Sequence, residues 1–351
     1  MSSESAGRAF IGSFTSTGGR GIVAAAVDPR TGALTEIGAT DAVADPSFLT
    51  VGHGAGGTVL YAVAETKDGA AAALDITGDV PRLIGGAPVP VDGASPTHLA
   101  LASGHLLTAN YGSGSVTALP VRADGSLGPA ASVLVHEGSG PVAARQAGPH
   151  AHQVLPDPTG RLVLSVDLGT DSVRVCALDA ESGALTLRAE TALRPGSGPR
   201  HLAFHPDGHH AYVLNELAPT VTVCRWDAEE GALTPLGETR VVGEDVTEPT
   251  HPSEVVVAHD GRFLWTANRG HDSLSVLALD AAGERAELVT TVPCGGRWPR
   301  DLTLDPSGRR LYASNERSGD VTWFDIDEET GVPRRAGALE GVPSATCVIF
   351  V

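Results

Sequence analysis

The chain has 351 residues, and its 42 acidic side chains against 24 basic ones give a formal net charge of −18 at pH 7. Because a protein that binds nucleic acid presents a basic face to the phosphates, this composition argues against a nucleic-acid partner. No apolar run approaches the roughly 18 residues of a membrane-spanning helix, so we expect no membrane partner either.

The N-terminal stretch MSSESAGRAFIGSF has no basic region followed by a long apolar run, so we expect no signal peptide. The four cysteines show no CxxC spacing, which predicts reduced thiols and a cytoplasmic protein. They are Cys176, Cys224, Cys294 and Cys347. Glycine (43 residues) and proline (24 residues) are frequent, which indicates many short elements joined by tight turns.

A unit of four predicted strands repeats along the chain. In the clearest copy the first strand follows Pro199, a Pro-Asp-Gly turn leads to a second strand at 211–215, and a third strand covers 221–226. A fourth strand starts at 232–234, after a turn that contains glycine. Six copies begin after prolines that recur every 47–53 residues: Pro46, Pro96, Pro149, Pro199, Pro252 and Pro299.

The two ends of the chain complete a seventh unit. The N-terminal segments at 9–14, 21–27 and 31–37 match second, third and fourth strands, whereas the C-terminal segment 342–351 matches only a first strand. The sequence therefore predicts an all-β fold, a seven-bladed β-propeller whose ring is closed when the C-terminal strand joins the N-terminal blade. We expect residues 1–351 to form a single propeller domain.

The first strands of a propeller line its central channel, so residues that follow the repeated prolines should gather at one mouth of it. This column reads Ser47, Thr97, His150, Arg200, Ser253, Arg300 and Ser344. The next column adds His98, His201, Glu254 and Asp301. Residues just past an asparagine that recurs at the end of the second strands add Glu65, Asp167, Glu216, Arg269 and Glu316.

Arg200, Arg269 and Arg300 are expected to converge from three blades. Guanidinium groups bind carboxylate or phosphate in a bidentate manner, so the cluster indicates an anion site. A histidine or glutamate beside it can activate water, with an arginine facing the developing oxyanion. The structural alternative is a ring of salt bridges between the blades. We expect the arginines to be exposed to water, so that their loss would spare the fold.

The pair His150 and His152 raises the question of a metal site. Positions i and i+2 of a strand face the same way, so two ligands are available, but the spacing offers no third one. The chain also lacks a GxSxG elbow, a phosphate-binding loop and a zinc signature. We therefore expect no metal in the site.

Four stretches resemble the lactonase family of seven-bladed propellers, which includes 6-phosphogluconolactonases and carboxymuconate lactonising enzymes. They are GPHAHQVLPDPTGR (148–161), GPRHLAFHPDGHHAYVLNEL (198–217), TANRGHDSLSVL (266–277) and FIGSFTSTGGRGI (10–22). The resemblance implies hydrolysis of 6-phosphogluconolactone to 6-phosphogluconate, a step of the pentose phosphate pathway, without a cofactor. The alternative within the family is a cycloisomerase that forms a lactone from a muconate-type dicarboxylate.

Position by position, the family pattern places catalysis on His150, Arg200, Glu216 and Arg269. Glu216 is expected to activate water with help from His150, while Arg200 and Arg269 stabilise the oxyanion. Residues expected to bind the substrate, a small anionic lactone, are Arg300, His152, His201, His98 and Glu254, with Arg300 at the phosphate. A third hypothesis is a non-catalytic propeller that binds a protein or peptide. Its rim would need exposed aromatics, and aromatic residues make up only 4% of this chain.

Overall fold

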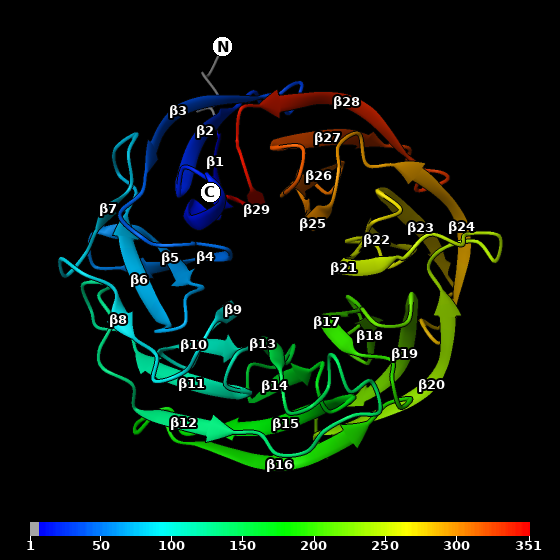
Figure 1. Cartoon of the computed structure of the whole chain (residues 1–351), viewed down its shortest axis with the longest axis horizontal. Helices are drawn as coiled ribbons and strands as arrows, with labels where there is room; N and C mark the ends of the chain where they lie inside the picture. The colour runs from blue at the N-terminus through cyan, green and yellow to red at the C-terminus, as the bar shows by residue number, and fades with distance from the viewer. Residues whose placement is uncertain (1–6) are drawn as a thin grey trace.

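The structure, a computed structural model, describes residues 7–351 and consists of seven antiparallel sheets in a ring around a central channel (Figure 1). The predicted seven-bladed propeller is thus confirmed. Residues 1–6, the start of the stretch in which we expect no signal peptide, lie outside the described residues. Across 7–351, no helix combines the length and the apolar character that a bilayer crossing requires.

Each blade runs from a first strand at the channel to an outer strand (Figure 1). The first strands are β4 (Leu49–Gly54), β9 (Pro96–Ala102), β13 (Ala151–Pro156), β17 (Pro199–Phe204), β21 (His251–Val257), β25 (Pro299–Leu304) and β29 (Ala345–Phe350). The second strands are β1 (Gly7–Ser13), β5 (Gly57–Ala64), β10 (His105–Asn110), β14 (Leu162–Asp167), β18 (His210–Asn215), β22 (Phe263–Arg269) and β26 (Arg310–Asn315).

The third strands are β2 (Ile22–Val27), β6 (Ala70–Asp75), β11 (Ser115–Pro120), β15 (Ser172–Leu178), β19 (Thr220–Asp227), β23 (Ser273–Leu279) and β27 (Asp320–Ile326). The outer strands are β3 (Leu34–Thr40), β7 (Arg82–Leu83), β8 (Val89–Pro90), β12 (Ser132–Val135), β16 (Leu185–Ala192), β20 (Ala232–Arg240), β24 (Ala286–Pro293) and β28 (Pro333–Glu340). Blades are named below by their first strand.

Closure of the ring follows the prediction. The C-terminal strand β29 pairs antiparallel with β1, and Ile11 lies opposite Val348. Cys347 packs into the apolar cluster shared with the β4 blade, while Val348 packs into the cluster shared with the β25 blade. The closing strand therefore contributes to the core on both of its sides.

The core is divided into seven apolar clusters, one between each pair of neighbouring blades. Their side chains are mainly Val, Leu and Ala, in keeping with the low aromatic content. Second-strand aromatics also bond across the interfaces: the hydroxyl of Tyr212 donates to the carbonyl of Gly283 (3.0 Å), and Trp265 Nε1 donates to that of Gly331 (2.7 Å). Each blade thus depends on its neighbours for both apolar and polar contacts.

A β-bulge near the start of the first strand recurs in six blades. In β17, Pro199 lies opposite Asn215 and His201 lies opposite Leu214, so Arg200 is the extra residue. A bulge re-aims the side chain of its unpaired residue. The bulge residues are Thr97, His152, Arg200, Ser253, Arg300 and Thr346.

This register corrects two positions of the predicted column. In β13 the place of the proline is taken by Ala151, and in β29 it is taken by Ala345. His152, not His150, therefore occupies the position equivalent to Arg200, and Ser344 lies before its strand. The prediction failed because Pro149 lies two residues ahead of the strand that it was taken to begin.

The recurring asparagines tie second strands to third strands. Asn215 Nδ2 donates to Thr220 Oγ1 (2.9 Å) and to Thr222 Oγ1 (3.0 Å), and the same pattern holds at Asn110, Asn268 and Asn315. In β14 the asparagine position is held by Asp167, which was predicted one place further on. Asp167 pairs with His136 and Arg174 and so is not one of the mouth residues.

Deletion of Ala345–Val351 should lower the melting temperature by about 10 °C or more, because it uncovers the edge of β1 and two apolar clusters. Thermal unfolding followed by circular dichroism measures the effect. Val351→Ala is the control, since this side chain is exposed at the end of the strand. A truncated protein that melts as sharply and as high as the full chain would contradict closure by β29.

Candidate active site

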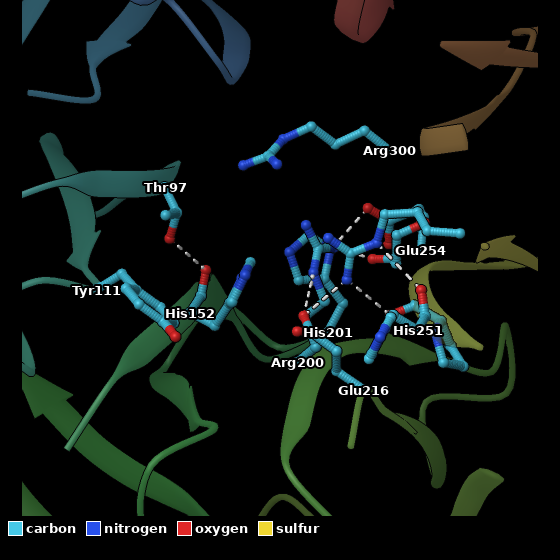
Figure 2. Close-up of polar contacts among 12 residues, drawn as sticks. Thr97, Tyr111, His152, Arg200, His201, Glu216, His251, Glu254 and Arg300 are labelled. Atoms are coloured by element: carbon cyan, nitrogen blue, oxygen red, sulfur yellow. Dashed lines mark hydrogen bonds and ion pairs between the residues drawn. The ribbon is translucent and has the colours of Figure 1, made fainter. Parts of the chain in front are cut away.

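The candidate site lies at the mouth where first strands begin and second strands end (Figure 2). Glu216, the residue after β18, is at its centre. Its carboxylate lies 2.6 Å from Arg145 Nη2, 2.8 Å from Arg269 Nη2 and 3.3 Å from Arg200 Nε. Arg269 ends β22, Arg200 is the β17 bulge, and Arg145 belongs to the segment between β12 and β13. Residues from two blades and from one connecting segment thus meet on one carboxylate.

These groups are buried rather than exposed to water, which corrects our expectation for the arginines. Glu216, Arg200 and Arg269 are 4%, 3% and 7% exposed. Arg200 also donates to the carbonyl of Ser253, and Arg269 Nε donates to the carbonyl of His251 (3.0 Å). The Arg200 contact connects the β17 and β21 blades and the Arg269 contact joins β22 to β21 within one blade, so both arginines have a structural role.

The charge state of Glu216 follows from these neighbours. Burial by itself would raise the pKa of the carboxyl group, but the positive charges of Arg269, Arg200 and Arg145 hold it well below its usual range. Both of its carboxylate oxygens are already engaged by guanidinium groups, so neither is free to accept a proton from water. The geometry therefore speaks against the expected role of Glu216 as the base and favours one as an anchor for the arginines.

Arg300, the bulge residue of β25, extends across the channel in Figure 2. Its guanidinium group lies 3.2 Å from Glu316 and 3.5 Å from Glu65, and its Cζ atom lies 4.7 Å from the centre of the Phe14 ring. The side chain is 17% exposed, which makes it more accessible than Arg200 or Arg269. Arg300 is therefore held in place while it still faces the channel.

Three histidines, His98, His152 and His201, form a layer in the channel, called the histidine layer below. Ring centres are 5.1 Å apart for His152 and His201 and 5.4 Å apart for His98 and His201. Burial, together with the charge of Arg200, lowers the pKa of all three well below the usual value, so the rings are neutral at pH 7. Each ring has one buried nitrogen without a hydrogen-bond partner.

A pair of carboxyl groups lies beside this layer. Glu254 Oε2 is 2.6 Å from His201 Nδ1, and the side chain of Glu254 also bonds to that of Asp301. Burial raises the pKa of Glu254 to about 7, and burial with the neighbouring Glu254 raises that of Asp301. Beyond the layer the channel continues as a cavity of about 450 Å³ whose polar lining includes His98, Gln153, Glu254 and Asp301.

A model of the family described as "Lactonase, 7-bladed beta-propeller" matches residues 8–350. The chain belongs to this lactonase family. A relative named 6-phosphogluconolactonase, from Bacillus subtilis strain 168, is 34% identical over 345 residues, which is 97% of each chain.

Solved structures agree with this family. The TM-score is 0.91 to a protein from Lactobacillus plantarum, at 29% identity and 99% coverage of both chains. For the periplasmic gluconolactonase of Pseudomonas aeruginosa the TM-score is 0.90, also at 29% identity, with 98% of this chain and 99% of that chain covered.

In this lactonase-family chain, eight of the nine predicted site residues fall into three groups. Arg200, Glu216 and Arg269 form the buried cluster, Arg300 extends across the channel, and His98, His152, His201 and Glu254 lie in or beside the histidine layer. His150 lies apart from them. It precedes β13, its ring stacks on Tyr111 with centres 4.3 Å apart, and its Nδ1 lies 2.8 Å from the carbonyl oxygen of Tyr111. The bulge at His152 breaks the alternation that would place His150 and His152 on one face.

Two residues of the site, Arg145 and Tyr111, were not predicted from the sequence. Arg145 lies in a connecting segment with no counterpart in the repeat, so no column contained it. A basic residue just before the GPHAHQ stretch was the available signal. Tyr111 follows Asn110 directly, so it occupies the same column as Glu216. Its side chain carries no charge, unlike those of the residues predicted from that column.

Glu216→Gln should cost about 3–5 kcal/mol of folding stability at pH 7, because Arg200 and Arg269 would lose their buried partner. The folded-state pKa of Glu216 lies below the unfolded value of about 4.3. The folding stability that ionised Glu216 contributes is therefore fully present above that pH and is lost as the pH falls further. The unaltered protein and the Glu216→Gln variant should therefore become more similar in stability below about pH 4.

Urea unfolding at pH 7 and at pH 3.5 measures this difference. Glu316→Gln is the control, because Glu316 is more exposed and the expected cost is about 1 kcal/mol or less. A stability difference that is equal at both pH values would show that the charge of Glu216 is not what holds the cluster.

Proposed function

We propose that the protein hydrolyses 6-phosphogluconolactone to 6-phosphogluconate. The observation that carries the proposal is the accessible guanidinium group of Arg300 at the same channel as neutral histidines with unpartnered ring nitrogens. An anion-binding group and a free base are the two requirements for hydrolysing a phosphorylated lactone. The name of the Bacillus relative supports this choice of substrate.

His201 is proposed as the general base. When Glu254 is ionised it accepts the Nδ1 proton of His201 at 2.6 Å, which leaves a lone pair on Nε2, the ring nitrogen without a partner. Nε2 then removes a proton from water as the water oxygen attacks the lactone carbonyl. The imidazolium returns this proton to the ring oxygen when the carbon–oxygen bond breaks, and the acid product ionises.

The arginines are proposed to stabilise negative charge. Arg200 and Arg269, held by Glu216, place two positive charges beside the histidine layer where the oxyanion develops. Arg300 binds the phosphate, since Glu65 and Glu316 orient its guanidinium group while leaving it partly exposed. His98 and His152 line the same space, and their free ring nitrogens are available to substrate hydroxyls.

The other hypotheses have less support. Lactone formation from a dicarboxylate needs the same arginines, and nothing in the geometry favours it over hydrolysis. A peptide-binding platform requires exposed aromatic anchors. Among the described residues, the exposed large hydrophobic side chains are valines and leucines.

The cytoplasm remains the proposed location. All four cysteines are unpaired, buried thiols, as expected for a reducing compartment. The Pseudomonas structure is named periplasmic, so cell fractionation is the measurement that decides between the two compartments.

His201→Asn should lower kcat/KM for the lactone about 100-fold or more, and Glu254→Gln should have a smaller effect in the same direction. Activity of the unaltered protein should fall as the pH drops through about 7, the pKa of Glu254. A protonated Glu254 donates to Nδ1 and so forces the proton of the neutral ring onto Nε2, which removes the base.

Kinetics corrected for spontaneous hydrolysis measure these effects between pH 5.5 and 8. His271→Asn is the control, because His271 lies in the turn after β22 and bonds to Ser273. A His201→Asn variant that is folded and fully active would exclude His201 as the base.

Arg300→Ala should raise KM for 6-phosphogluconolactone about 10-fold or more and should change the constants for unphosphorylated gluconolactone little, because only the former carries the phosphate. Arg317→Ala, at an exposed arginine of the same mouth, is the control. Equal changes in the kinetic constants for both lactones would exclude phosphate binding by Arg300, but they would not contradict the proposed hydrolysis.

A further inference from the structure

The turn between β17 and β18 carries a cluster of potential ligands at the opposite end of the blade from the mouth. His205 Nδ1 and His210 Nδ1 each lie 3.0 Å from Asp207 Oδ2. One ligand atom from each of these side chains lies within 4.8 Å of the others. Two imidazoles therefore direct the same nitrogen at one carboxylate oxygen.

Hydrogen bonds of His205 show what this nitrogen presents to the carboxylate. Its Nε2 lies 3.2 Å from the carbonyl oxygen of Gly261, which can only accept, so Nε2 carries the proton. Its Nδ1 accepts the backbone N–H of Asp207 at 3.2 Å, so Nδ1 carries a lone pair. Nδ1 and Asp207 Oδ2 are then two acceptors 3.0 Å apart, an arrangement that a cation between them would stabilise.

The turn itself does not need histidines, as the equivalent turns of the β13 and β25 blades show. Asp157, His205 and Asp305 occupy the same position, since each donates its backbone N–H to the carbonyl of the residue five places on, at 2.8–2.9 Å. Asp157 and Asp305 use their carboxylates to accept backbone N–H groups of the turn. In the β17 blade this position holds His205 instead of an aspartate, and the carboxylate of the turn belongs to Asp207, two residues further on.

We propose that His205, Asp207 and His210 bind a divalent transition-metal ion of the zinc class through Nδ1, Oδ2 and Nδ1. Two imidazole nitrogens and a carboxylate oxygen form a ligand set that Zn²⁺ accepts, with water in the fourth position. Asp207 Oδ1 accepts the backbone N–H of His209 at 2.7 Å, which orients the carboxylate and leaves Oδ2 for the ion.

The surroundings match those of a metal site. The bond from His205 Nε2 to the Gly261 carbonyl is the second contact that usually orients a ligating histidine. Asp207 and His210 also line a groove of about 740 Å³, which leaves room for the water ligand. Because Gly261 belongs to the next blade, the bound ion would stabilise the joint between the β17 and β21 blades.

Zinc binding to tag-free protein, freed of metal by chelation, tests the proposal by calorimetry. One equivalent of Zn²⁺ should bind and raise the melting temperature, and Co²⁺ should give the strong visible absorption of a tetrahedral site. His210→Gln should weaken Zn²⁺ binding by more than about 100-fold, beyond the 10- to 100-fold typical of changing a residue that only orients a ligand. His209→Ala, the adjacent histidine outside the cluster, is the matched control.

Lactone hydrolysis separates this proposal from the proposed function. Chelation should leave kcat and KM unchanged, since the cluster is at the far end of the blade. If His210→Gln is poorly folded, X-ray absorption of the zinc-loaded unaltered protein replaces it and should show two imidazoles and one carboxylate oxygen. Absence of saturable binding, or equal weakening by His209→Ala and His210→Gln, would overturn the proposal.

Discussion

Closure of the ring by β29 is the constraint on which the rest of the molecule depends. Each blade covers its apolar faces with its two neighbours, so a missing first strand would open two of the seven clusters at once. The same closure shapes the site. Arg300 of the β25 blade reaches past the closing blade to Glu65 of the β4 blade, and it lies over Phe14, which follows β1. The proposed phosphate contact therefore exists only in the closed ring.

Charge is distributed unevenly between the body of the protein and the mouth of the channel. The chain carries a net charge of −18, yet Arg145, Arg200, Arg269 and Arg300 surround one opening. Glu216 pairs with three of them from a buried position, which stabilises the cluster in a buried environment. Burial, together with the same positive charges, keeps the nearby histidines neutral, and this supplies the free base that the proposed hydrolysis requires.

The strand β17 connects the two functional proposals. Its bulge places Arg200 and His201 at the mouth, and its other end leads into the turn with His205 and Asp207. A metal ion at that turn would stabilise the β17–β18 hairpin at the end opposite the mouth. The site and the turn are thus supported by one rigid strand, although the chemistry of each is independent of the other.

The sequence by itself determined the blade number, the ring closure and most of the residues at the mouth. Repeats of about 50 residues are local patterns, and a propeller places equivalent positions of each repeat at equivalent places in the ring. Arg200, Glu216, Arg269 and Arg300 could be found in this way, as could His98, His201 and Glu254.

Only the tertiary structure decided how these residues are used. The bulge placed His152 where His150 was expected, and Arg145 entered from a segment outside the repeat. Burial and pairing favour Glu216 as an anchor for the arginines over its predicted role as the base. The roles of Arg145 and Glu216 depend on contacts between residues that are 50 or more positions apart in the chain, such as Glu216 with Arg145 and Arg269, and no local pattern records such contacts.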